Sequence, residues 1–145
     1  LFGMLTSSIH MAWMRVVAGR LGMSYRYSPS VYYNFPWQKI SSAQKRAIEA
    51  TAQEILDVRA RYFEMARCKD GKIESENKLS TFPSDNLSFS LADLYDELTM
   101  PRDLRLAHRK NDLAVAKAYG FEEILEDEPA IVAELFKRCE LLTKN

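Results

Sequence analysis

The chain has 145 residues, of which 47% are hydrophobic and 28% are charged. This composition is typical of one or two small globular domains and excludes disordered and fibrous proteins. No run of 18 apolar residues occurs, so the sequence predicts no membrane span. The chain starts at Leu1 without a basic segment, which predicts no signal peptide and indicates a piece of a longer, cytoplasmic protein. Cys68 and Cys139 are far apart in sequence and are expected to be free thiols.

Equal numbers of acidic and basic side chains, 20 of each, hide an asymmetry along the chain. Residues 1–40 contain Arg15, Arg20, Arg26 and Lys39 but no Asp or Glu. An acid-free segment rich in aromatic residues suits contact with a polyanion such as DNA. A buried segment with few charges would have the same composition, so the two interpretations stay open at this point.

The first forty residues predict one helix and a short β-hairpin. Apolar side chains recur at helical spacing over residues 7–21, and Gly22 stands where a glycine would end that helix. Residues 24–35 are rich in tyrosine and predict two short strands that meet in a turn at residues 28–30. Two strands alone do not make a stable sheet, so this part is expected to belong to a larger domain.

Helix signals follow one another from Ser41 to the end of the chain. Ser41 and Gln44 form the S-x-x-Q pattern of a capping box, and Ser90 with Asp93 repeats its logic. Residues 67–89 are polar and predict a long loop. Capping residues and apolar periodicity together predict helices at 42–66, 91–95, 101–119 and 129–143. The three longer helices are expected to pack together as a C-terminal helical bundle, which makes the fold class mainly α.

Several short motifs extend this interpretation. They are SSIHMAWMRVVAGR at 7–20, Tyr-Arg-Tyr-Ser at 25–28, Tyr-Asn-Phe-Pro-Trp at 33–37, Leu-Ala-Asp-Leu-Tyr-Asp at 91–96 and Ala-Tyr-Gly at 118–120. In this order they resemble the MmeI-like enzymes, which are fused type II restriction–modification proteins. The resemblance implies that residues 1–40 are the end of a target-recognition domain and that residues 41–145 are a C-terminal helical domain. Relatives usually read Tyr-Asn-Asn-Phe-Pro-Trp-Pro, from which this chain differs at Tyr33 and Gln38.

The resemblance also implies an activity for the full-length protein. Its members transfer a methyl group from S-adenosylmethionine to N6 of adenine in double-stranded DNA, through a methyltransferase domain upstream in the same chain. Adenine methyltransferases use an Asn/Asp-Pro-Pro-aromatic motif, whereas none of the five prolines here are adjacent and the five glycines form no cofactor loop. We therefore expect no catalytic residue, no metal ligand and no cofactor site in this chain. By itself it is expected neither to bind S-adenosylmethionine nor to methylate DNA.

The expected DNA-binding residues are Arg15, Arg20, Gly22, Ser24 and Arg26. In the family, sequence reading is assigned to two positions just before the Tyr-Arg-Tyr-Ser motif, which are Gly22 and Ser24 here. Gly22 has no side chain, so direct reading would fall to Ser24; Gly22 as a plain helix cap is an equally good interpretation. The arginines are expected to contact phosphate from the same surface, although Arg26 could also read guanine or serve a structural role.

Other candidate residues have simpler explanations. Tyr25 and Tyr27 are expected to pack within the domain, and His10 and His108 lack a paired carboxylate or cysteine at ligand spacing. Asp70, Glu76 and Lys78 superficially resemble a nuclease metal site, but solvated charges explain them better. The alternative function is a non-enzymatic helical module that binds protein. Strong salt dependence of binding would distinguish DNA contact from such docking.

Overall fold

The computed structural model describes the backbone of residues 1–70 and 90–143, and the side chains of residues 1–66 and 90–142. Among the described residues the fold is helical apart from one two-stranded antiparallel hairpin, so the predicted mainly α class is confirmed. The elements in chain order are α1 (Phe2–Leu5), α2 (Ser8–Val17), β1 (Gly19–Leu21), β2 (Ser24–Arg26), α3 (Pro29–Tyr33), α4 (Ser42–Asp70), α5 (Leu91–Leu94), α6 (Arg102–Tyr119), the 3-10 helix η1 (Glu122–Ile124) and α7 (Glu128–Thr143).

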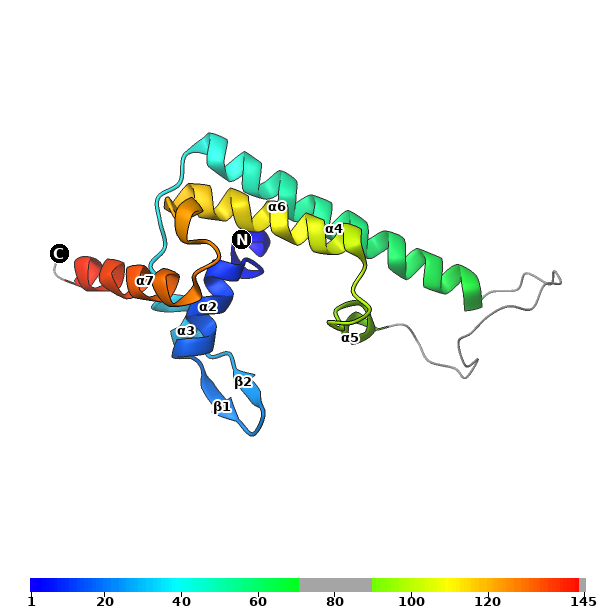
Figure 1. Cartoon of the computed structure of the whole chain (residues 1–145), viewed down its shortest axis with the longest axis horizontal. Coiled ribbons are helices and arrows are strands. Elements are labelled where there is room, and N and C mark those ends of the chain that lie inside the picture. Colours follow the sequence, from blue (N-terminus) through cyan, green and yellow to red (C-terminus); the bar gives the residue numbers. More distant parts are fainter. Residues whose placement is uncertain (71–89, 144–145) are drawn as a thin grey trace.

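Helices α4 and α6 lie side by side in opposite directions and form a long arm (Figure 1). The predicted capping box begins α4: the Ser41 amide donates to Gln44 Oε1 at 2.8 Å, and the Gln44 amide donates to Ser41 Oγ at 3.2 Å. Gly120, with φ of +68°, ends α6 as predicted, because a left-handed residue stops the helix and glycine adopts it without strain. Buried Ile55, Val58 and Leu104 fill part of the space between the two helices.

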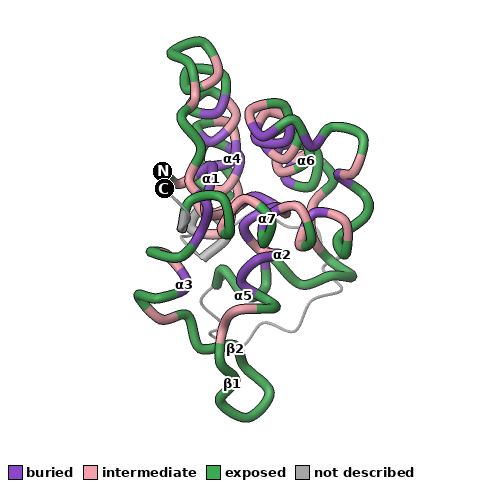
Figure 2. The backbone as a smooth tube through the Cα atoms, turned by 90° about the vertical axis from the view of Figure 1, so that its left-hand side faces the viewer, coloured by how far each residue is buried: buried purple, intermediate pink, exposed green. Residues whose placement is uncertain are grey.

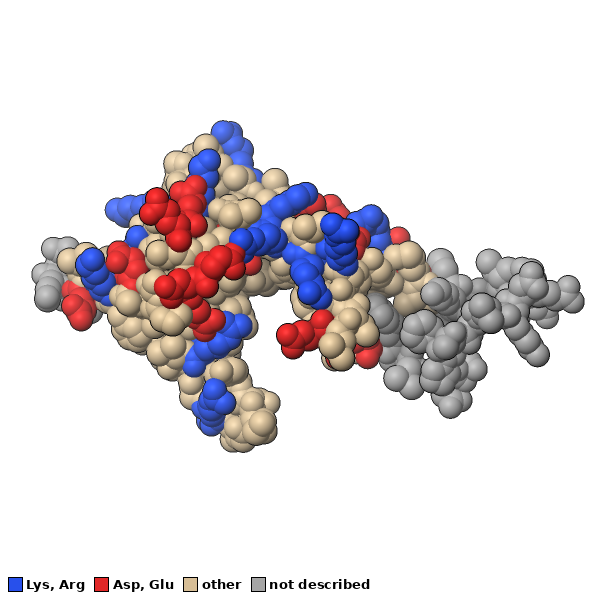
Figure 3. All heavy atoms as spheres, viewed as in Figure 1, with Lys and Arg blue, Asp and Glu red and all other residues tan. Residues whose placement is uncertain are grey.

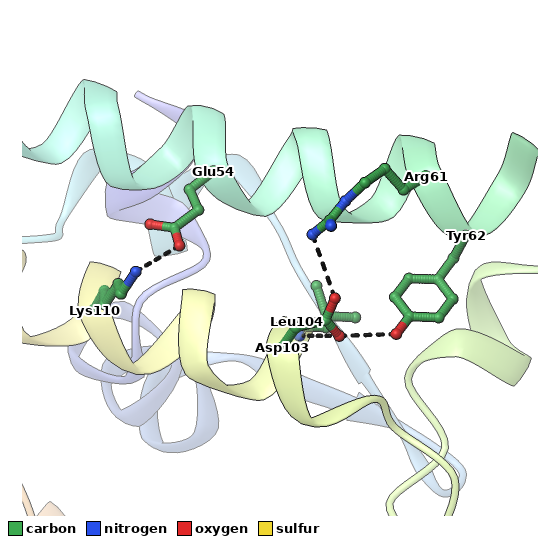
Figure 4. Close-up of polar contacts among 6 residues, drawn as sticks. All are labelled: Glu54, Arg61, Tyr62, Asp103, Leu104 and Lys110. Carbon is green, nitrogen blue, oxygen red and sulfur yellow. Dashed lines mark hydrogen bonds and ion pairs between the residues drawn. The ribbon is translucent and has the colours of Figure 1, made fainter.

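Polar contacts on the surface of the arm join its two helices (Figure 4). Lys110 Nζ lies 2.6 Å from Glu54 Oε1. Asp103 accepts hydrogen bonds from the Tyr62 hydroxyl at 2.9 Å and from Arg61 Nη2 at 3.3 Å. Exposed ion pairs of this kind stabilise a protein little, typically ~0–1 kcal/mol each. The buried apolar face therefore supplies most of the stability, and the pairs favour one register of α4 on α6.

All remaining elements except α5 form a body at one end of the arm, whereas α5 lies near the start of α6 (Figure 1), and its Leu94 joins the buried cluster of the arm. Helix α7 packs mainly on α2 rather than on α4, so the expected mutual packing of the three long helices is found for α4 with α6 only. Trp13 and Ile9 of α2 share one buried cluster with Ile131 and Leu135 of α7. Val115 of α6 belongs to the same cluster. The first forty residues and the C-terminal helices therefore share a hydrophobic core.

The hairpin and the helix before it differ from the sequence-based expectation. The helix predicted over 7–21 ends at Val17, and Gly22 lies in the turn between β1 and β2 with φ of +61°. Gly22 as a plain helix cap was therefore wrong. Of the strands expected within 24–35, only Ser24–Arg26 is extended.

Residues Pro29–Tyr33 form a helix where a second strand was expected. Proline fits the first turn of a helix, and Trp13 Nε1 donates to the carbonyl of buried Val31 at 2.9 Å. Burial against α2 thus overrides the strand preference of the tyrosines. Helix α4 continues to Asp70, so residues 67–70 are helical rather than the start of the predicted loop, and residues 71–89 lie outside the described part. None of the described helices combines the length and apolar character needed to cross a membrane.

Gly3 of α1 approaches α4 and α6 closely, which provides a test of this packing. A Cβ at Gly3 would lie 2.7 Å from Asn111 Oδ1, 2.9 Å from Ile48 Cγ2 and 3.0 Å from Ala52 Cβ. We expect Gly3→Ala to lower the free energy of unfolding by about 1–3 kcal/mol, because overpacking outweighs the better helix propensity of alanine.

The matched control is Gly19→Ala, because a Cβ at Gly19 would meet no atom within 4 Å. This variant should unfold within about 0.5 kcal/mol of the wild type. Urea unfolding followed by circular dichroism measures both. Equal stability of Gly3→Ala and the wild type would contradict the close approach of α1.

Candidate nucleic-acid interface

The β1–β2 hairpin projects from the body, and its strands pack mainly on each other (Figure 1). Every residue of both strands is exposed, as are Gly22 and Met23 in the turn (Figure 2). The hairpin contains Arg20 and Arg26 and no acidic residue. The carboxylates seen in Figure 3 lie on the body, on the arm and around α5, so the projecting hairpin itself carries only positive charge.

The register of the hairpin assigns its side chains to two faces. Gly19 pairs with Arg26, Arg20 with Tyr25, and Leu21 with Ser24. Paired residues share a face and successive residues alternate, so Leu21, Ser24 and Arg26 lie on one face. Arg20 and Tyr25 lie on the other. We call these the free face and the paired face.

The paired face is internally satisfied. Arg20 Nη2 donates to the Tyr25 hydroxyl at 2.9 Å, and its guanidinium carbon lies 4.6 Å from the centre of the tyrosine ring. Tyr25 therefore packs on an arginine at the surface rather than within the core that the sequence predicted. On the free face, neither Ser24 nor Arg26 has a side-chain hydrogen bond or ion pair to any described residue.

The five residues predicted to contact DNA are thus only partly brought together. Arg20 and Arg26 occupy opposite faces of the hairpin, although one surface was expected. Gly22 lies in the turn, so alternation along an extended strand does not relate it to Ser24. Arg15 is on α2, where its Nη1 lies 2.7 Å from Glu128 Oε2 of α7. Arg15 therefore joins two helices of the body.

His10 supports the base of the hairpin from within the body. Its Nε2 lies 2.9 Å from the hydroxyl of Tyr27, the residue directly after β2. The imidazole is buried, and its centre lies 4.7 Å from that of Phe35. Burial lowers the pKa of His10 below 6.5, so the neutral ring is favoured. Tyr27 is half exposed, and partial burial raises the pKa of its hydroxyl. Nothing in the sequence indicated Tyr27 as the partner of His10.

Among the described residues, no second candidate site is as clearly defined as the hairpin. They contain no group of three or more His, Cys, Asp or Glu side chains arranged to hold a metal ion. His108 Nε2 lies 2.7 Å from the Tyr95 hydroxyl, and burial lowers the pKa of this histidine too. Glu76 and Lys78 lie outside the described residues, as does the side chain of Asp70.

Two family models and two known proteins match this chain. Residues 1–39 match the family model "MmeI, target recognition domain", and residues 79–145 match "MmeI, C-terminal domain". DNA methyltransferase A of Bacillus subtilis (strain 168) is 36% identical over 129 residues, which are 88% of this chain and 12% of that protein. The structure of the type IIL restriction-modification enzyme MmeI in complex with DNA is also similar, with a TM-score of 0.74 and 37% identity. That match covers 99% of this chain and 16% of the other, so this chain spans a small part of both relatives.

Burial of the two histidines gives the stability of the chain a pH dependence. A histidine whose pKa is lowered by folding binds fewer protons in the folded state than in the unfolded state. The free energy of unfolding is therefore highest above about pH 6.5, the ordinary pKa of histidine in an unfolded chain. It decreases as the pH falls below that value, by at most ~1.4 kcal/mol per pH unit for each histidine. We expect His10→Gln, measured by urea unfolding between pH 8 and 5.5, to show a shallower decline than the wild type.

His108→Gln is the matched control, since it removes the other buried histidine and leaves the base of the hairpin intact. Asp112, whose pKa is raised by burial, contributes equally to all these proteins. Each single variant should keep part of the decline, and the double variant should lose most of it. Parallel profiles for the wild type and His10→Gln would show that His10 is not held neutral by the fold.

Proposed function

We propose that the β1–β2 hairpin contacts double-stranded DNA in a site-specific DNA methyltransferase. The chain belongs to the MmeI family and carries the end of its target recognition domain and its C-terminal domain. The observation that carries this proposal is the projecting hairpin itself. It has two arginines, exposed backbone and side chains, and no carboxylate to repel phosphate. A two-stranded ribbon is also one of the shapes that the major groove of DNA admits.

The chemistry of methylation would lie elsewhere in the full-length protein. We propose that a methyltransferase domain upstream in the same chain binds S-adenosylmethionine and methylates N6 of adenine. This chain would then contribute no catalytic group, no metal ligand and no cofactor contact. Its role is to contact DNA and to hold the contacting element in place, in the cytoplasm where the DNA is found.

The C-terminal helices provide that support. Helix α7 packs on α2, directly before the hairpin, and the Arg15–Glu128 pair joins the same two helices. His10 holds Tyr27 directly after the hairpin. Both ends of the hairpin are therefore attached to a core that α6 and α7 complete. This arrangement supports a buttressing role for the C-terminal domain.

A helical module that binds another protein is the competing function. The apolar depression of about 420 Å³ lined by Trp13, Phe35 and Phe136 would suit such docking. The acid-free hairpin favours DNA instead. Protein docking on apolar surfaces depends weakly on salt, whereas binding to phosphate depends on it strongly.

Arg20 tests the DNA proposal, since we assign it a phosphate contact. Arg20→Ala in the full-length protein is expected to weaken binding to all DNA sequences and to reduce the slope of log K against log salt by about one. The matched control is Arg46→Ala, because Arg46 is also exposed but lies on α4, away from the hairpin. Fluorescence anisotropy titrations at salt concentrations from about 50 to about 200 mM measure the affinity and the salt slope of both variants. An unchanged slope in Arg20→Ala would count against the proposal.

Gly22 and Ser24 test the reading of sequence. A charged pair at these positions, Gly22→Asp with Ser24→Lys, is expected to change the preferred base pair at one position of the methylated site. Aspartate suits the left-handed backbone at Gly22, where φ is +61°. Gly22→Asn is the control that makes the same backbone demand without the charge. The readout is methylation of a library of sites. The reading role would be refuted by active enzyme that methylates an unchanged sequence.

A further inference from the structure

The free face of the hairpin presents three different chemistries in a row. Leu21 is apolar, Ser24 can donate or accept a hydrogen bond, and Arg26 carries five N–H donors. The register places Leu21 directly opposite Ser24 in the last pair before the turn. Sequence spacing alone relates Ser24 to Gly22, so this pairing with Leu21 is visible only in the folded hairpin.

Leu21 has no packing role among the described residues. The residue is 73% exposed, and it belongs to neither of the two buried clusters. A single exposed leucine needs no explanation. Leu21, however, lies beside two polar side chains without partners, on a projecting element that has no acidic residue. Met23 in the adjoining turn is 97% exposed, so the apolar surface continues to the tip.

This combination matches the edges of base pairs in the major groove. Thymine presents there a C5 methyl group beside the O4 acceptor, and guanine presents two acceptors that an arginine can bind. An apolar side chain gains by covering the methyl group, whereas it gains nothing from phosphate. The paired face does not offer this chemistry, because Arg20 and Tyr25 are occupied with each other.

We propose that Leu21 is a specificity-determining residue that covers the C5 methyl group of a thymine, next to the base pair that Ser24 faces. The inference rests on the proposed function, since it requires the hairpin to lie in the major groove. It adds an apolar contact and a residue on β1 to a reading surface that the sequence assigned to Gly22 and Ser24. It also assigns the free face, rather than the paired face, to the bases.

The test removes one methyl group from the DNA and its partner from the protein. In the full-length enzyme, each thymine of the methylated site is replaced singly by deoxyuridine, which differs only in lacking the C5 methyl group. For wild type we expect one position at which this replacement lowers kcat/KM for methylation by about fourfold, the value of one buried methylene. In Leu21→Ala the penalty at that position should disappear, because nothing covers the methyl group. Leu21→Met, whose side chain restores the apolar contact, should restore the penalty for removing the methyl group.

Two controls isolate the contact. Leu98→Ala removes a leucine that is 93% exposed but precedes α6, and it should keep the full penalty. Tyr25→Phe alters the paired face by one hydroxyl and should also keep it. A penalty that persists in Leu21→Ala, or the absence of any sensitive thymine in wild type, overturns the inference. If Arg20→Ala still lowers the salt slope in that case, the DNA contact of the hairpin stands and only the role of Leu21 fails.

Discussion

The buried side chain of Asn111 joins three segments that are far apart in the sequence. Its Nδ2 donates to the carbonyl of Gly3 at 2.7 Å, and its Oδ1 accepts from the Thr51 hydroxyl at 3.1 Å. A buried amide without partners costs about 1–3 kcal/mol, so these bonds favour one relative position of α1, α4 and α6. Because α1 leads directly into α2, this position also fixes where the recognition elements begin.

The hairpin depends on that frame although it lies outside it. Strands of three residues have no stability of their own. Nine residues, 18–26, separate the end of α2 from Tyr27, and they include both strands. What holds the hairpin is the packing at its two ends. Before the hairpin, helix α2 packs on α7. After the hairpin, Tyr27 contacts His10 of the body. A projecting element fixed in this way can change its surface residues without disturbing the core.

The two faces of the hairpin differ in what they contribute to the fold. Arg20 and Tyr25 stabilise the ribbon by covering each other, and the remaining N–H donors of the Arg20 guanidinium stay available to phosphate. Leu21, Ser24 and Arg26 contribute nothing comparable to the fold. Residues that do no structural work are free to vary with the ligand.

The sequence alone determined the fold class, the helices at 42–66, 101–119 and 129–143, and both capping boxes, since these depend on local spacing and on side chains within one turn of each helix terminus. The family was also evident from its motifs. The local signals misplaced the hairpin, because Gly22 suits a helix end and a turn equally, and because tyrosines favour strands unless burial decides otherwise. Only the tertiary structure decided that Pro29–Tyr33 is a helix under Trp13, that Arg15 faces Glu128, and that Leu21 lies opposite Ser24. Each of these depends on packing between distant segments or on strand register, and no local pattern of residues contains that information.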